Sequence, residues 1–151
     1  PVVYVGSWSS GGDMNQARFL TGGAGSSNSA ALAFGGRTPA PADVALTENY
    51  NGTSWSEDNN MVSGRESLMG CGVSTAALAF GGTIPPGRTA NTESWNGSSW
   101  TELGDLSAGV ASNGGNGNSR LALNAGGDVS GRVTTTEEWT VPFATKTLGT
   151  D

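Results

Sequence analysis

Short apolar runs recur along the chain, and each ends in a pair of glycines. The segment AALAFGG occupies residues 30–36 and again residues 76–82, and LALNAGG at 121–127 is a third, altered copy. Self-similarity at a nearly fixed spacing is the signature of a repeat architecture. We therefore expect one domain over residues 1–151, built from three repeats with flanking segments at 2–10 and 141–151. The expected repeats are 11–57, 58–102 and 103–140.

Aromatic residues keep the same period as the glycine pairs. Trp8, Trp55 and Trp100 are separated by 47 and 45 residues, and each follows a small polar residue. Together with the glycines they define a structural signature for the repeat. Its members are Gly35, Gly36, Gly81, Gly82, Gly126, Gly127, Trp8, Trp55, Trp100, Tyr50, Trp95 and Trp139.

The pattern within a repeat predicts four short strands. A Gly-rich segment comes first, an apolar run second, a Thr- and aromatic-rich segment third, and a segment with the repeated Trp fourth. Asn51-Gly52 and Asn96-Gly97 precede the fourth segment and predict type I′ hairpin turns. Helical periodicity is absent, and the glycine content opposes helices. The expected fold is all-β, with strands at 17–24, 30–34, 47–50 and 54–57; 65–71, 76–80, 92–95 and 99–102; 108–115 and 134–139.

Composition narrows the function classes. The chain has 25 Gly, 13 acidic and 7 basic residues, no His, and a net charge of −6. A nucleic-acid partner is not expected, because such proteins need a basic surface. No apolar stretch approaches the roughly 20 residues of a membrane span, so we expect no membrane insertion. Without His, we expect neither a metal site nor a cofactor. The single Cys71 is expected to be a buried, unreactive thiol on the innermost strand.

The repeat resembles the kelch motif, in which an apolar run ending in Gly-Gly is followed by two spaced aromatics. Leu32-Ala33-Phe34-Gly35-Gly36 is followed by Tyr50 and Trp55, and the second repeat matches in the same way. The third repeat departs from the pattern, because Ala125 replaces the Phe. The resemblance implies a segment of a β-propeller with three four-stranded blades.

Three blades do not close a ring, since propellers have about 4–8. The apolar outer faces would then be covered by a second copy, by another protein, or by further repeats of a longer chain. Residues 2–8 resemble the end of a repeat, so we hypothesise that the Trp8 strand completes the last blade of a closed ring. Pairing of residues 141–145 as that strand would contradict this hypothesis. Alternatively, residues 140–151 leave the domain as a tail.

Loops between the second and third strands, at 37–46, 83–91 and 128–135, are expected on one face. The connections after the fourth strands should emerge on the same face. The candidate ligand-binding residues there are Arg37, Arg88, Arg132, Asp13, Asn60 and Asp105. Arg and carboxyl groups hydrogen-bond the hydroxyls of a carbohydrate or contact a protein receptor. The alternative is structural: Asp and Asn cap turns, and Arg pairs with a neighbouring Glu.

The sequence pattern NGTSWSEDNN…GR…STAALAFGG resembles the kelch-like arrays of marine bacteriophage tail-fibre and appendage proteins. That resemblance implies an extracellular, virion-bound, non-enzymatic module that binds a host surface glycan or receptor. A purely structural virion assembly protein and a secreted microbial carbohydrate-binding or hydrolytic propeller remain alternatives. Glycoside cleavage would need a carboxylate pair from among Glu57, Asp58, Glu102 and Asp105, which lie in different repeats.

Overall fold

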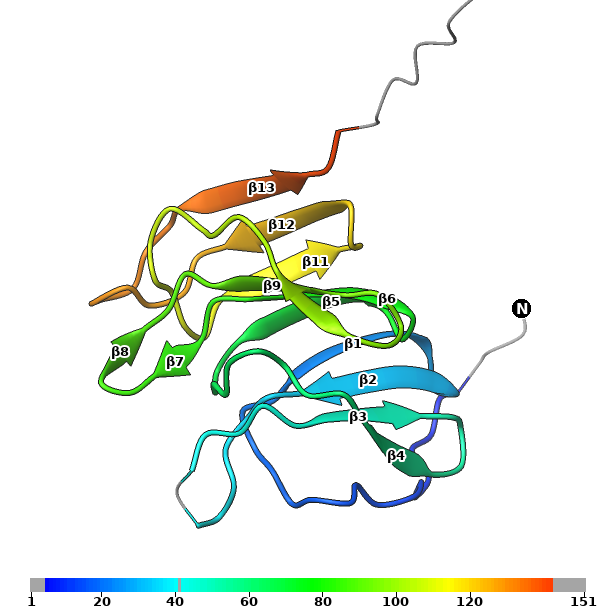
Figure 1. Ribbon diagram of the computed structural model, residues 1–151. Coiled ribbons are helices and arrows are strands. Elements are labelled where there is room, and N and C mark those ends of the chain that lie inside the picture. Colours follow the sequence, from blue (N-terminus) through cyan, green and yellow to red (C-terminus); the bar gives the residue numbers. More distant parts are fainter. Residues whose placement is uncertain (1–4, 41, 143–151) are drawn as a thin grey trace, which may run out of the picture.

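The computed structural model describes residues 5–40 and 42–142, and these residues form an all-β structure. They contain 13 strands in four antiparallel sheets, none of them closed, and no helix (Figure 1). Consequently nothing in the described part of the chain is a helix able to cross a membrane. The predicted all-β class is confirmed.

Three of the sheets correspond to the three sequence repeats. The first sheet contains β1 (Gly22–Ser27), β2 (Ala30–Phe34), β3 (Thr47–Tyr50) and β4 (Trp55–Asp58) in that order. The second sheet contains, from its inner strand outward, β5 (Met69–Val73), β6 (Ala76–Phe80), β9 (Thr92–Trp95) and β10 (Trp100–Glu102). The third sheet contains β11 (Gly114–Gly117), β12 (Leu121–Ala125) and β13 (Thr136–Thr140). A small fourth sheet, which the sequence did not predict, pairs β7 (Thr83–Ile84) with β8 (Gly87–Arg88).

The apolar runs and the Thr-rich segments of the first two repeats form strands at the predicted residues. The first strand of each repeat begins later than predicted, at residues 22, 69 and 114. A left-handed residue precedes each of these strands: Leu20, Ser67 and Ser112 have φ of 56°, 54° and 54°. Because this conformation interrupts an extended chain, the residues before it cannot belong to the strand.

The turns at Asn51-Gly52 and Asn96-Gly97 are not the type I′ turns that the sequence predicted. Tyr50 pairs with Trp55, so four residues form the loop. Gly52 has a φ of 97°, but Asn51 does not have a positive φ. Instead, the Asn51 Oδ1 accepts hydrogen bonds from the backbone N–H groups of Thr53 and Ser54, each at 2.9 Å. The Asn side chain therefore stabilises an Asx-type turn.

The third sheet has three strands, whereas the first two sheets have four. Residues 141 and 142 form no strand, and the rest of the 141–151 segment lies outside the described residues. Residues 5–10 also form no strand, while residues 2–4 are not described. Within the described chain, β13 is consequently an edge strand with one unpaired side.

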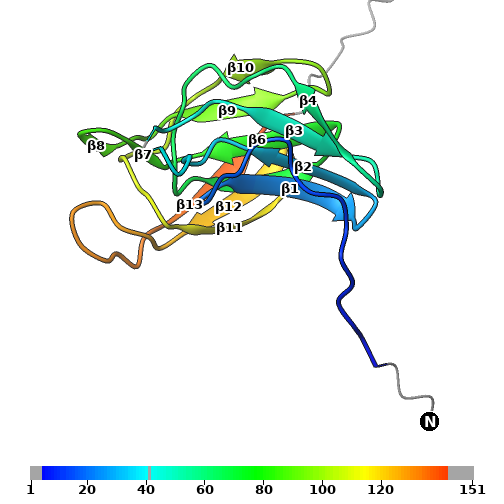
Figure 2. The same cartoon turned by 90° about the horizontal axis from the view of Figure 1, so that it is seen from below.

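Neighbouring sheets pack face to face through two apolar clusters. The three sheets follow one another in a row (Figure 1), with β5 lying beside both β1 and β11. Viewed from below, β1 and β11 lie toward one side of the molecule and β4 and β10 toward the other (Figure 2). The cluster between the first and second sheets contains Leu32, Phe34, Met61, Leu68, Ala77, Ala79, Trp95 and Trp100. The cluster between the second and third contains Cys71, Leu78, Phe80 and Ala122.

The glycine pairs connect one repeat to the next. All six glycines of the signature have positive φ, which other residues rarely adopt. The Gly36 N–H donates to the Arg65 carbonyl at 2.8 Å, and the Gly82 N–H donates to the Val110 carbonyl at 2.7 Å. The glycine pair is therefore retained because its backbone conformation brings the next repeat within hydrogen-bonding distance.

Candidate functional site

The boundary between the first and second sheets is filled by the outer-strand residue Trp100. Its ring lies 4.9 Å from Phe34 in an edge-on arrangement and 5.4 Å from Trp95, measured between ring centroids. Its indole N–H donates to the Thr47 Oγ1 at 2.9 Å. Trp100 lies opposite Trp95 in the β9–β10 ladder. One side chain of the fourth strand thus completes the boundary with the preceding sheet.

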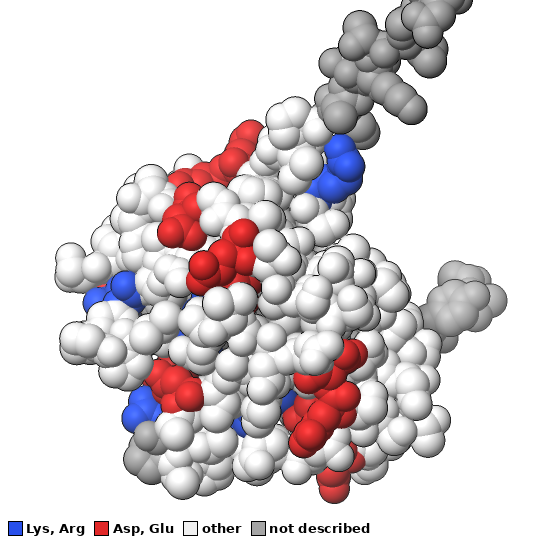
Figure 3. All heavy atoms as spheres, in the orientation of Figure 1, with Lys and Arg blue, Asp and Glu red and all other residues white. Residues whose placement is uncertain are grey.

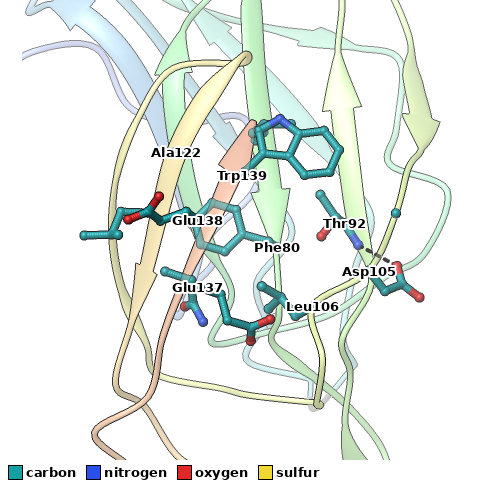
Figure 4. Close-up of a pocket in the computed structure, with 12 residues that line it drawn as sticks. Phe80, Thr92, Asp105, Leu106, Ala122, Glu137, Glu138 and Trp139 are labelled. Atoms are coloured by element: carbon teal, nitrogen blue, oxygen red, sulfur yellow. Dashed lines mark hydrogen bonds between the residues drawn. The ribbon is translucent and has the colours of Figure 1, made fainter. Parts of the chain in front are cut away.

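The boundary between the second and third sheets has the same surroundings but lacks this tryptophan. Phe80, Thr92 and Trp139 are the repeat equivalents of Phe34, Thr47 and Trp95. They lie around a hollow of about 70 Å³, which we call the edge hollow (Figure 4). It is also lined by Leu78, Gly104, Asp105, Leu106, Ala122, Leu123, Asn124, Glu137 and Glu138.

The equivalent tryptophans of the second and third sheets, Trp95 and Trp139, differ in how far they are exposed to solvent. Trp95 is 1% exposed, because Trp100 lies over it. Trp139 is only half-buried, although its indole N–H donates to the Ser119 carbonyl just as Trp95 donates to Ser74. The edge hollow is therefore the position that an outer-strand tryptophan fills in the other boundary.

The first two sheets each contain a buried ion pair between an arginine and a glutamate. Arg18 donates to Glu48 at 2.7 Å and Arg65 donates to Glu93 at 2.9 Å, with all four side chains at most 2% exposed. Each carboxylate also accepts a hydrogen bond from a backbone N–H at 2.7 Å. Glu48 accepts from Asn15, and Glu93 accepts from Val62. Each pair joins the segment before a sheet's first strand to the third strand of that same sheet.

The third sheet keeps the carboxylate but not the arginine. Ser107 N–H donates to Glu137 at 2.8 Å, in the same place as the Asn15 and Val62 bonds. Val110 occupies the position equivalent to Arg65 and is 3% exposed. A bond between the side chains of Asn113 and Asn124, at 2.6 Å, lies nearby in the same sheet. The carboxylate of Glu137, half-buried, therefore lines the edge hollow without a guanidinium partner among the described residues.

Burial and pairing have opposite effects on the two paired groups. Burial raises the pKa of Glu48, but the hydrogen bonds from the Asn15 N–H and the Arg18 guanidinium outweigh it, so that the pKa lies below its ordinary value. For Arg65, burial lowers the pKa and the Glu93 carboxylate only partly offsets this.

The outer faces of the row are less covered than the boundaries within it. Leu32 and Leu78 are 2% and 1% exposed, whereas the equivalent Leu123 of β12 is 39% exposed and Leu121 is 57% exposed. Trp8 is fully exposed. The third sheet thus presents an apolar face of the kind that is buried in the first two sheets.

Two series of backbone hydrogen bonds connect successive repeats. One is made by the glycine pairs described above, and the other is made by the left-handed residues before the first strands. Ser67 N–H donates to the Leu20 carbonyl, and Ser112 N–H donates to the Ser67 carbonyl, both at 2.9 Å. Within the described residues, neither the Ser112 carbonyl nor the Gly127 N–H makes the bond that its equivalents make. The row therefore ends with groups oriented for a further repeat.

Two of the three predicted loop arginines make ion pairs with residues of the following repeat. Arg37 contacts Asp43 at 3.8 Å and Glu66 at 3.3 Å, and Arg88 contacts Asp128 at 2.6 Å. These partners differ from the Glu neighbours that the sequence suggested. The Arg88 hydrogen bond is the main reason why the pKa of the Asp128 carboxyl is lowered, and Arg132 contributes weakly.

The predicted residues after the fourth strands are all exposed. Asp13 and Asn60 lie five residues before Arg18 and Arg65, respectively, and Asp105 lines the edge hollow. The Asp105 carboxylate accepts the Thr92 N–H at 3.1 Å (Figure 4), a bond to a residue 13 positions away and not a local turn cap.

The face shown in Figure 3 carries several separate groups of acidic side chains and fewer basic ones. Some of the basic groups lie at its left edge, over loop 37–46 and the β7–β8 hairpin of Figure 1. Within residues 5–40 and 42–142, no group of three or more Cys, Asp or Glu side chains could hold a metal ion. Cys71 is buried, and burial raises the pKa of its thiol to about 11.

Sequence reasoning missed the Arg18–Glu48 and Arg65–Glu93 pairs and the edge hollow. The spacing of 47 residues between the two arginines was a usable signal, because it equals the spacing of Trp8 and Trp55. Compared with known proteins, the chain matches no family model and no curated protein.

Proposed function

We propose that the chain is a non-enzymatic structural and adhesive module made of three blades of a kelch-like β-propeller. The observation that carries this proposal is the repeated boundary, in which equivalent residues of successive sheets make equivalent contacts. Packing of β1, β5 and β11 side by side supports the same arrangement, since inner strands gather around the axis of a propeller.

A second copy of the chain completes the ring in this proposal. Two sets of three blades give six, which lies within the usual range of about 4–8. Closure would cover the exposed Leu121 and Leu123 and would continue the backbone series that ends at Ser112 and Gly127. A closed ring also removes the unpaired edges that make open sheets prone to aggregation.

The adhesive part of the proposal places a host surface glycan or receptor on the loop face. Loops 37–46 and 128–135 and the β7–β8 hairpin emerge on the same side in Figure 1. Loops on a rigid scaffold are where binding usually occurs. The resemblance to phage tail-fibre and appendage proteins supports a virion-bound, extracellular setting. Arg132 and the exposed Asp13 and Asn60 are the candidates for polar contacts with the ligand.

A purely structural virion assembly role is the second candidate, and the ion pairs favour it. Arg37 and Arg88 contact acidic residues of the following repeat, so two of the three candidate arginines already stabilise the scaffold. On this alternative the faces and edges of the blades bind other virion proteins, and the loops bind nothing.

A glycan array separates the two candidates. The labelled wild-type chain is compared with Arg132→Ala on the loop face and with Arg120→Ala, which removes the same charge from the β11–β12 turn at the other end of the sheet. The adhesive proposal expects glycan signals that Arg132→Ala weakens and Arg120→Ala retains. Absence of glycan binding by the assembled wild type would exclude a glycan ligand and favour the assembly role.

A further inference from the structure

Each tryptophan of a fourth strand is followed, seven residues later, by a backbone N–H that bonds to the next sheet. Trp55 precedes Val62, which bonds to Glu93 of the second sheet, and Trp100 precedes Ser107, which bonds to Glu137 of the third. The tryptophan and the N–H therefore belong to the connection between one sheet and the one that follows it.

Trp8 stands in the same relation to Asn15, seven residues later. The Asn15 N–H bonds to Glu48 of the first sheet at 2.7 Å. By the same rule, the segment that begins at Trp8 is the fourth strand of a sheet that precedes the first sheet. Its fully exposed indole and its lack of strand structure agree with a missing partner sheet.

The third sheet of the same chain does not lie beside the first. The second sheet separates them, and β13 is at the far end of the row from the N-terminal segment (Figure 1). Seven residues span at most about 24 Å, and in the other two connections they reach only an adjacent sheet. The partner sheet is therefore not the third sheet of the same molecule.

We propose that residues 8–10 of a second copy add to the free edge of β13 and place the Trp8 side chain in the edge hollow. This inference rests on the proposed ring and names the contact that closes it. The exchange is reciprocal, because each copy has one Trp8 segment and one edge hollow. Such a self-complementary interface is the usual basis of a two-fold dimer.

The β9–β10 ladder provides the register of the added strand. There Trp100 lies opposite Trp95, Thr101 opposite Ser94 and Glu102 opposite Glu93. Transposed to the third sheet, Trp8 lies opposite Trp139, Ser9 opposite Glu138, and Ser10 opposite Glu137. The indole N–H then donates to the Thr92 Oγ1 and the ring packs on Phe80, as Trp100 does on Thr47 and Phe34.

Cysteine cross-linking tests this register directly. A chain carrying Ser9→Cys is mixed with a chain carrying Glu138→Cys, and the mixture is oxidised mildly. The expected product is a disulfide-linked pair containing one chain of each kind, since opposed positions lie within about 4.5–5.5 Å between Cβ atoms. Ser9→Cys with Thr136→Cys, at the first position of β13 and two residues from Glu138, is the control and should link poorly. The buried native Cys71 is present in both mixtures.

Substitution of the tryptophan tests its contribution to affinity. Trp8→Ala should weaken dimer formation by at least about thirty-fold, the loss typical of a central aromatic anchor. Val5→Ala, in the same exposed segment, should leave the dimer unchanged. Because Trp8 is exposed in the single chain, Trp8→Ala should not alter its folding, as circular dichroism will check.

The outcomes distinguish this inference from the proposal on which it rests. A dimer that persists undiminished in Trp8→Ala, or a mixture of the Ser9→Cys and Glu138→Cys chains that forms no more mixed disulfide than the control mixture, overturns the strand exchange but leaves a closed ring possible by another contact. A wild-type chain that stays monomeric overturns both the exchange and the ring.

Discussion

Trp100 and Thr47 are hydrogen-bonded across the boundary between two repeats, with the indole N–H 2.9 Å from the threonine Oγ1. The residues are 53 positions apart in sequence, and both side chains are buried. The bond directs the tryptophan into a site that Phe34 and Trp95 close from either side. A large apolar ring and one satisfied polar group thus hold the first two sheets together.

Replacement of this tryptophan should be among the most destabilising changes in the chain. Trp100→Ala removes a buried ring and leaves the cavity that is seen at the third sheet, so we expect the free energy of unfolding to fall by about 3–5 kcal/mol. Thr101→Ala, at the next and exposed position of β10, should change it by less than about 0.5 kcal/mol. Urea denaturation followed by tryptophan fluorescence and circular dichroism measures both. Equal effects of the two variants would contradict the assignment of Trp100 to the boundary.

The buried carboxylate of the second sheet should matter more than its equivalent in the third. Glu93→Gln leaves the guanidinium of Arg65 buried without a counter-charge, and we expect a loss of about 3–5 kcal/mol. Glu137→Gln makes the same change where no arginine is present, and the amide oxygen still accepts the Ser107 N–H. Its cost should stay below about 1 kcal/mol. Chemical denaturation of the two variants provides the comparison, and a cost for Glu137→Gln as large as that for Glu93→Gln would argue against the role of the ion pair.

Acidification should remove the contribution of the Arg18–Glu48 pair. The pKa of Glu48 is lower in the folded state than its ordinary value of 4.5. Its stabilising contribution is therefore fully present above pH 4.5 and is lost as the pH falls through the folded-state pKa. The free energy of unfolding measured at pH steps from 7 downward should decline in this acid range, and Glu48→Gln should flatten the decline. An unchanged slope in the variant would show that other carboxyl groups are responsible.

The close approach of β1 and β5 should make Gly70 intolerant of any side chain. A Cβ atom at this position would lie 2.5 Å from the Gly23 carbonyl oxygen and against the Phe34 ring. Gly70→Ala should therefore destabilise the chain by about 1–3 kcal/mol, as overpacking does. At Gly87 no atom lies within 4 Å of such a Cβ, so Gly87→Ala should be nearly neutral. Thermal unfolding of both variants tests whether the inner strands are packed this closely.

Much of the fold could be predicted from the sequence because its local signals are strong. The runs at Ala30–Phe34 and Ala76–Phe80 are apolar, short and ended by glycines, and they coincide with β2 and β6. The third strands at Thr47–Tyr50 and Thr92–Trp95 also coincide with the prediction. The first strands were misplaced because Gly-rich segments carry no alternation, and the left-handed residues Leu20, Ser67 and Ser112 are not glycines.

The edge hollow and the ion pairs were less accessible to sequence reasoning, because they are relations between repeats. The hollow beside Phe80, Thr92 and Trp139 exists because no counterpart of Trp100 packs against these residues in the described chain. Such an absence leaves no signal in the local sequence. Arg18 and Arg65 likewise gave no local signal, and their pairing with Glu48 and Glu93 depends on the register between a connection and the strand it covers. The ion pairs of Arg37 and Arg88 depend on how adjacent loops meet.

Measurement of the mass of the wild-type chain in solution, by light scattering coupled to size exclusion, tests the central claim most directly. Three sheets that end in exposed apolar and backbone groups should not remain alone, and we predict a particle of twice the 15.2-kDa chain mass. A mass of 15.2 kDa at every concentration tested, with a cooperative unfolding transition, would show that the row of sheets is stable by itself and would contradict the account.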